Sequence, residues 1–174
     1  MSTMHPLGEI LRDDSGALSL RFERRMSHPP VRVWRAITES DQLRYWMPCD
    51  IVGPREQGAA IVVPFWDDVA EKYSIEEPIL TGRIVTWDPP HRFAWEWDDE
   101  RLTFDLEPVD GGTVLTLTVR LGSKGPGADR VGAGYHRCLD QLVTLVENDD
   151  APPFLSGDGT EFEPLYADLL ARLS

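Results

Sequence analysis

Aromatic side chains recur at alternate positions of two strand-like segments that follow one another in the chain. Phe93, Trp95 and Trp97 share one face of residues 92–98, and Phe104 belongs to residues 102–106. A period of two places such side chains on a single face of a β-strand. Rings grouped in this way either fill a core or line an apolar pocket for a small hydrophobic molecule. Alternation does not separate these two interpretations, so both stay open.

A long amphipathic helix is predicted opposite these rings, over residues 131–147. Its apolar side chains recur at steps of three and four and therefore share one helical face. They are Val131, Tyr135, Cys138, Leu139, Leu142 and Val146. The polar side chains fall on the other side, at Arg137, Asp140, Gln141, Thr144 and Glu147. The strands and this helix together predict an apolar cavity, with these lining residues: Trp46, Phe93, Trp95, Trp97, Phe104, Leu117, Tyr135, Leu139 and Leu142.

Carboxylates beside the rings are natural candidates for acid–base chemistry, but the alternation argues against them. Glu96, Asp105 and Glu107 have the opposite parity to the rings, so they should point to water. The acidic run at 98–100 is interpreted as a solvated loop between two strands. No catalytic residue is therefore assigned.

Two side chains are candidates for polar contacts with a bound molecule. Arg24 shares parity with Leu20 and Phe22 and is directed inward, although arginines more often reach out to a rim. His136 follows Tyr135, about 100° further round the helix axis, at the edge of the predicted buried face. There it could act as a base or hydrogen-bond a ligand. The histidines have no partners at metal-ligand spacing, so neither a metal nor a cofactor is expected.

The composition favours a single acidic domain. A formal charge of −13 repels phosphate backbones and anionic lipids, so neither nucleic acid nor a membrane is expected as a partner. No apolar run approaches the ~20 residues of a membrane span, and the N-terminus lacks the apolar core of a secretory signal. Cys49 and Cys138 make no disulfide framework. A cytoplasmic location is the simplest inference.

The order of elements predicts a domain over residues 17–148, with a loosely held arm at 1–16 and a linker and helical extension at 149–174. A strand at 18–26 leads into two short helices, which are followed by hairpin-linked strands as far as 119. Residues 66–77 are interpreted as an exposed connection containing a short strand. The glycine-rich run at 122–127 is interpreted as a crossover loop, and a last helix is predicted at 162–173.

Several segments, taken in order, resemble one known family: proteins similar to the C-terminal domain of the activator of the heat-shock protein 90 ATPase. Its opening resembles RFERRMSHPPVRVWRAITESDQLRYWMP, and its middle resembles ILTGRIVTWDPPHRFAWEW. Its last strand and closing helix resemble GGTVLTLTVRL and GYHRCLDQLVTLVE. The resemblance covers residues 18–148. Tyr135 stands where relatives usually place Trp, and the chain continues beyond the common domain after Asn148.

This resemblance implies an α+β fold, the helix-grip fold of the START-like (SRPBCC, Bet v 1-like) superfamily. A curved antiparallel sheet would wrap around a long C-terminal helix. Two short helices would follow the first strand, and an extra helix would end the chain.

Three functions remain open. The first is binding of a small hydrophobic molecule in the cavity, without turnover. The second is a cyclase- or dehydratase-type enzyme acting in the same cavity, which rests on fold-level analogy alone. The third is interaction with a chaperone, which is less expected for a lone domain of this kind. The leucine stripe of the last helix also leaves a homodimer open.

Overall fold

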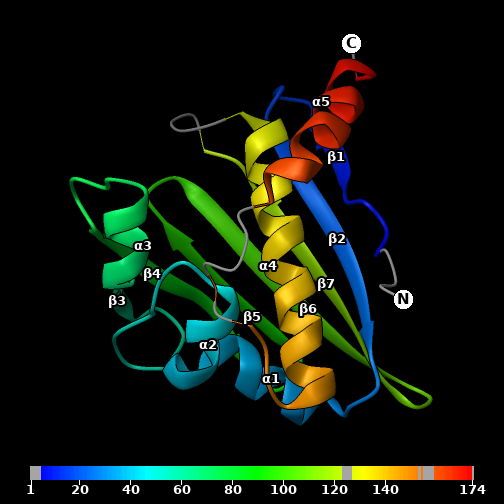
Figure 1. Cartoon of the computed structure of the whole chain (residues 1–174). Coiled ribbons are helices and arrows are strands. Elements are labelled where there is room, and N and C mark those ends of the chain that lie inside the picture. Colours follow the sequence, from blue (N-terminus) through cyan, green and yellow to red (C-terminus); the bar gives the residue numbers. More distant parts are fainter. Residues whose placement is uncertain (1–4, 123–126, 153, 155–158, 174) are drawn as a thin grey trace.

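The structure, a computed structural model, describes residues 5–122, 127–152, 154 and 159–173. Within these residues, seven antiparallel strands form one curved sheet in the order β1-β2-β7-β6-β5-β4-β3 (Figure 1). The strands are β1 (Glu9–Arg12), β2 (Leu18–Met26), β3 (Ala60–Pro64), β4 (Ile79–Asp88), β5 (Arg92–Trp97), β6 (Glu100–Val109) and β7 (Gly112–Arg120).

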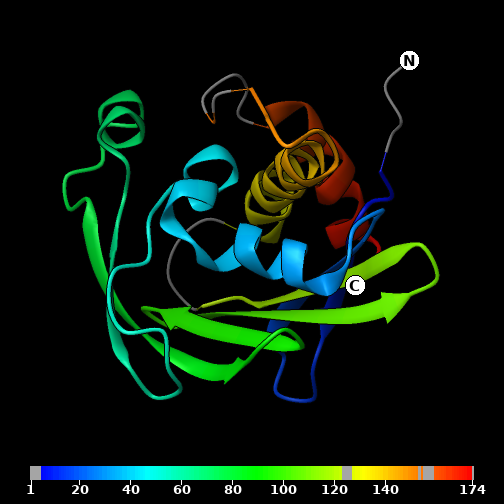
Figure 2. The same ribbon diagram turned by 90° about the horizontal axis from the view of Figure 1, so that it is seen from below.

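Helices cover the concave side of this sheet. They are α1 (Pro30–Thr38), α2 (Ser40–Trp46), α3 (Asp67–Lys72), α4 (Ala128–Asn148), the short 3₁₀ helix η2 (Thr160–Phe162) and α5 (Glu163–Ala171). Figure 2 shows the sheet curving around α1, α2 and α4, with α5 beside α4. In the described part of the chain, no helix has the length and apolar character needed to cross a membrane. The architecture confirms the predicted α+β helix-grip fold.

Local sequence accounts for the elements that carry the core. Along β2, Leu20, Phe22, Arg24 and Met26 are buried, whereas the alternate residues Arg21, Glu23 and Arg25 are exposed. Pro30 occupies the first turn of α1, where its missing N–H leaves no helical bond unmade. In β4 a bulge shifts the register between Ile84 and Thr86, which explains why no single face of this strand is predicted by alternation.

Two predicted segments differ in the structure. Residues 66–77 contain α3 rather than a strand, and its first turn carries Asp67 and Asp68, which favour a helix N-terminus. The predicted loose arm is partly ordered as β1, which pairs with β2 and buries Ile10. Of the predicted crossover loop and linker, residues 123–126, 153 and 155–158 lie outside the described residues, as do 1–4 and 174.

Most of the predicted aromatic set forms a filled core. Its members are each at most 1% exposed: Trp46, Phe93, Trp95, Phe104, Leu117, Leu139 and Leu142. Phe104 stacks on Phe93 with centroids 6.2 Å apart and meets Trp46 edge-on at 6.0 Å. The Trp46 indole N–H also donates to the Ala36 carbonyl at 2.8 Å, which fixes its ring in the core. Contacts at these distances are typical of close-packed interiors.

Candidate functional site

An apolar hollow of about 380 Å³ lies beside α4, on the side of the molecule that carries α3. We call it the α3 cavity. Its lining residues are Met47, Pro48, Phe65, Val69, Tyr73, Ile75, Trp97, Glu100, Val131, Gly134, Tyr135, Arg137, Cys138 and Phe154. Almost all are apolar or aromatic, and they come from segments between residues 47 and 154.

Four parts of the fold form most of its walls, and Met47, Pro48 and Phe154 complete them. The ends of β5 and β6 contribute Trp97 and Glu100, and one flank of α4 contributes Tyr135. Phe65 follows β3, and its ring lies 5.8 Å from that of Trp97. The segment of α3 supplies Val69 and the residues just after it. The cavity therefore lies where the sheet's strands end, at one edge of the filled core.

Glu100 places a carboxylate in this apolar surrounding. Its Oε1 accepts a hydrogen bond from the Tyr135 hydroxyl at 2.6 Å and another from the Trp97 indole N–H at 3.2 Å. Burial raises the pKa of Glu100, while these two hydrogen bonds act to lower it. Burial also raises the pKa of Tyr135 well above its ordinary value, so this hydroxyl stays protonated and donates.

The structure brings only two of the predicted lining residues, Trp97 and Tyr135, to the α3 cavity. The others belong to the filled core. They lie deeper along the same strands and the same helical face, where α1 and α2 close over the sheet. Trp34 of α1, for example, meets Phe93 edge-on at 6.0 Å. A side chain's parity fixes its face of a strand but not its distance from the end of the sheet.

Glu100 corrects the interpretation of residues 98–100 as a solvated acidic loop. It is the first residue of β6 and shares the inward parity of Leu102 and Phe104, so alternation extended by one step would have found it. Phe65 likewise continues the inward parity of Ile61 and Val63.

The carboxylates predicted to face away from the rings do so. Glu96 pairs with Arg101 and Asp105 with Arg92 on the outer face of the sheet.

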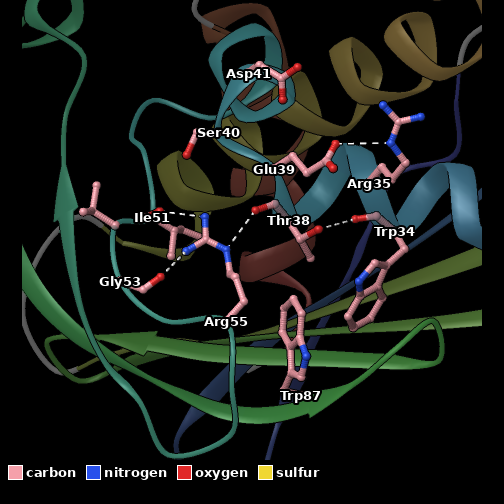
Figure 3. Close-up of a pocket in the computed structure, with 11 residues that line it drawn as sticks. Trp34, Arg35, Thr38, Glu39, Ser40, Asp41, Ile51, Gly53, Arg55 and Trp87 are labelled. Atoms are coloured by element: carbon pink, nitrogen blue, oxygen red, sulfur yellow. Dashed lines mark hydrogen bonds and ion pairs between the residues drawn. The ribbon is translucent and has the colours of Figure 1, made fainter.

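A second hollow, of about 780 Å³, lies between the α1–α2 junction, residues 51–55 and Trp87 of β4 (Figure 3). Arg55 occupies its middle and donates to the carbonyl oxygens of Thr38, Gly53 and Ile51, at 3.1, 3.1 and 2.7 Å. At its rim Arg35 pairs with Glu39 at 3.2 Å. These three charged side chains are thus bound to the protein itself. The hydrogen bonds of Arg55 join the α1–α2 junction to the loop of residues 51–55.

Comparison with known proteins assigns this chain to a protein family. The model of the family described as activator of Hsp90 ATPase homolog 1-like proteins matches residues 27–147. The chain belongs to this family. No curated protein matches it in sequence. The matched residues begin just after β2 and end in the last turn of α4, so they include most of the residues that line the α3 cavity.

Solved structures share the fold of this activator-homolog-like chain. A conserved protein of unknown function, EF2215 from Enterococcus faecalis, has a TM-score of 0.78 at 22% identity, covering 96% of this chain and 92% of that one. CalU16 from Micromonospora echinospora has a TM-score of 0.66 at 21% identity, covering 94% and 95%. DynU16, a putative protein in the dynemicin biosynthetic locus, has a TM-score of 0.62 at 18% identity, covering 76% and 48%.

The predicted polar contacts, Arg24 and His136, lie outside the cavity lining. Arg24 is buried, as its parity predicts, and its guanidinium lies 3.5 Å from the Asp140 carboxylate and donates to the Pro6 carbonyl at 3.1 Å. His136 is 2% exposed; its Nδ1 lies 2.8 Å from the Tyr166 hydroxyl.

These groups join α4 to segments outside the family match. The helix face that carries Asp140 was predicted to lie opposite the core, but α5 and the N-terminal segment cover part of it. Gln141 on that face is also buried and donates to the Pro152 carbonyl at 2.9 Å.

Proposed function

We propose that this protein binds a small hydrophobic molecule in the α3 cavity. The observation that supports the proposal best is the lining: a hollow of about 380 Å³ whose walls are mainly apolar, with the rings of Phe65, Tyr73, Trp97 and Tyr135 around one carboxylate. Its volume falls within the ~300–1,000 Å³ of small-molecule sites, which are mostly apolar with a few polar groups. The filled core beside it supplies rigid walls.

A fluorescent probe tests the proposal directly. N-phenyl-1-naphthylamine, a neutral two-ring probe, should bind saturably and gain fluorescence as it leaves water. Gly134 offers a variant that fills the cavity, because it lines the hollow and a Cβ added there meets no atom within 4 Å. Gly134→Phe should weaken probe binding by about tenfold or more, since the new ring occupies the probe's space.

Gly134→Ala is the matched control. It makes the same change of backbone propensity but leaves most of the cavity empty, so its affinity should stay within about threefold of the wild type. Equal probe binding by Gly134→Phe and the wild type would reject the α3 cavity as the site. Absence of saturable binding to the wild type would count against ligand binding itself.

A second candidate is an enzyme acting on a hydrophobic substrate in the same cavity. The observation that favours it is the pair of Glu100 and Tyr135, an acid and a hydroxyl 2.6 Å apart in an apolar hollow. Buried carboxyls with raised pKa values are typical of general acids and bases. Substrate turnover abolished by Glu100→Gln, with probe binding retained, would favour this candidate over a binding protein.

We propose a cytoplasmic location, a proposal supported by the two buried free thiols, Cys49 and Cys138. Two further predictions stay open: interaction with a chaperone, and a homodimer formed through α5. Of the apolar residues of α5, Leu165 is 39% exposed, whereas Tyr166 is fully buried against the domain. Size-exclusion chromatography of the whole chain would test the dimer.

A further inference from the structure

We infer that the α3 cavity selects apolar molecules that carry a protonated amine over apolar carboxylates, with Glu100 as the group that recognises the ligand. This inference rests on the proposed function and adds the ligand's chemical class. It begins from the position of one acidic side chain, Glu100, among the aromatic rings of the cavity lining.

The hydrogen bonds of Glu100 leave acceptor capacity for a ligand. Among the described residues, the bonds from Tyr135 and Trp97 both end on the same oxygen, Oε1. An ionised carboxylate has about four lone-pair sites on its two oxygens. The two donors therefore fix the carboxylate's orientation while Oε2 can accept from a ligand. A ligand amine placed there would form a charge-assisted hydrogen bond, which is stronger than a neutral one.

Among the described residues, the charged side chain that acts on the pKa of Glu100 is Asp99, another carboxylate, which raises that pKa. Arg137 also lines the cavity, but it lies on the flank of α4 near residue 154, where it donates to the Phe154 carbonyl at 3.4 Å. A ligand carboxylate beside Glu100 would meet a like charge in a poorly solvated site, and repulsion there is costly.

The aromatic walls suit a cation as well as an apolar group. Trp97 and Phe65 lie 5.8 Å apart, and Tyr73 and Tyr135 also face the hollow. Ring faces attract ammonium groups within about 6 Å, most strongly for Trp. Tyr73 already makes such a contact, since the ammonium of the adjacent Lys72 lies 5.4 Å from its ring centre. The hollow therefore offers a ligand ammonium both a carboxylate and aromatic rings.

Three naphthalene derivatives of similar size test the inference: 1-naphthylmethylamine, 1-naphthylmethanol and 1-naphthoate. Binding to the wild type is measured by isothermal titration calorimetry near neutral pH. The amine should bind about tenfold or more tightly than the carboxylate, with the alcohol between them. In Glu100→Gln, whose amide oxygen still accepts from Tyr135 and Trp97, the amine and carboxylate affinities should converge to within about threefold.

Glu107→Gln is the matched control, because it removes the same charge from an exposed site on the same strand. It should preserve the wild-type preference, which separates recognition by Glu100 from the general attraction of cations by an acidic protein. Equal affinities of amine and carboxylate for the wild type, with the alcohol bound, would overturn the inference and leave the proposed function standing. A preference for 1-naphthoate would assign selection to Arg137 and also overturn it. Binding of none of the three would overturn both.

Discussion

The Tyr166 hydroxyl of α5 lies 2.8 Å from Nδ1 of His136 on α4, and the same oxygen accepts the backbone N–H of Gly8 at 2.8 Å. One phenol thereby joins both ends of the chain to the long helix. In the neutral tautomer that carries its proton on Nε2, His136 accepts the Tyr166 hydroxyl proton at Nδ1, and its Nε2 lies 3.5 Å from Asp140 Oδ2. The ring of Phe162 packs on His136 at 4.1 Å. The helix α5 is therefore docked on α4.

Tyr166→Phe should lower the free energy of unfolding by about 1–3 kcal/mol, because it leaves the Gly8 N–H and His136 Nδ1 buried without their partner. Urea denaturation followed by tryptophan fluorescence measures the change. Tyr45→Phe, at a tyrosine that is 37% exposed, is the control and should change stability by less than about 0.5 kcal/mol. Equal stabilities of Tyr166→Phe and the wild type would mean that α5 is not docked in solution.

Acid should destabilise the fold through His136. Burial, and then the positive charges of Arg24 and His5, lower the pKa of His136 from 6.5 to about 4. The folded state thus favours the neutral imidazole. The resulting stability is fully present above the unfolded-state pKa and is lost as the pH falls from about 6.5 towards 4. Asp140 acts in the opposite sense, because burial raises its pKa and disfavours its charged form as the pH rises.

His136→Gln isolates this contribution, since the amide is neutral at every pH. Thermal unfolding is compared at neutral pH and near pH 5. The variant should be less stable than the wild type at neutral pH, yet should lose less stability on acidification. His91→Gln, at an exposed turn, should keep the wild-type pH dependence. If the melting temperature of the wild type does not decrease from neutral pH to about pH 5, that result would argue against a buried neutral imidazole.

Much of this fold could be predicted from alternation and helical periodicity, because both patterns report which side of an element is buried. The strands that carry Phe22, Phe104 and Leu117 and the helix that carries Tyr135 and Leu139 all follow them. The position of the cavity could not be predicted in this way. Trp95 and Trp97 have the same parity, yet Trp95 is closed in the core and Trp97 faces the hollow, because only Trp97 lies at the strand's end.

Contacts between distant segments were also beyond the sequence patterns. Asp140 and Gln141 read as a polar helical face, but α5 and the residues before β1 cover it, and no local signal indicates this covering. Glu100 is a different case, since its parity pointed inward and only its acidic neighbours suggested a loop.

Two glycines of α4 should respond in opposite ways to the same substitution. A Cβ at Gly132 would lie 2.8 Å from the Tyr166 ring, whereas a Cβ at Gly134 meets no atom within 4 Å. Gly134→Ala should stabilise the protein by about 0.5–1 kcal/mol through helix propensity alone. Gly132→Ala should destabilise it by about 1–3 kcal/mol, because the buried ring must move. Urea denaturation of both variants measures these changes. If the free energy of unfolding changes in the same direction in both, that result would contradict this packing of α5 on α4.

The division between filled core and cavity predicts that a substitution in the core and a substitution in the cavity wall have different effects on stability and on probe binding. Phe104 is 1% exposed and packs between Phe93 and Trp46, so Phe104→Leu should lower the free energy of unfolding by about 1–2 kcal/mol. It should leave the affinity for N-phenyl-1-naphthylamine unchanged, because Phe104 does not line the α3 cavity. Phe65→Leu removes a ring from the cavity wall and should weaken the probe about threefold or more, at a smaller cost in stability. Denaturation and probe titration of the two variants separate the alternatives. A loss of probe affinity in Phe104→Leu as large as that in Phe65→Leu would show that ligands enter between the sheet and the helix at the deeper rings, where the core is filled in this structure.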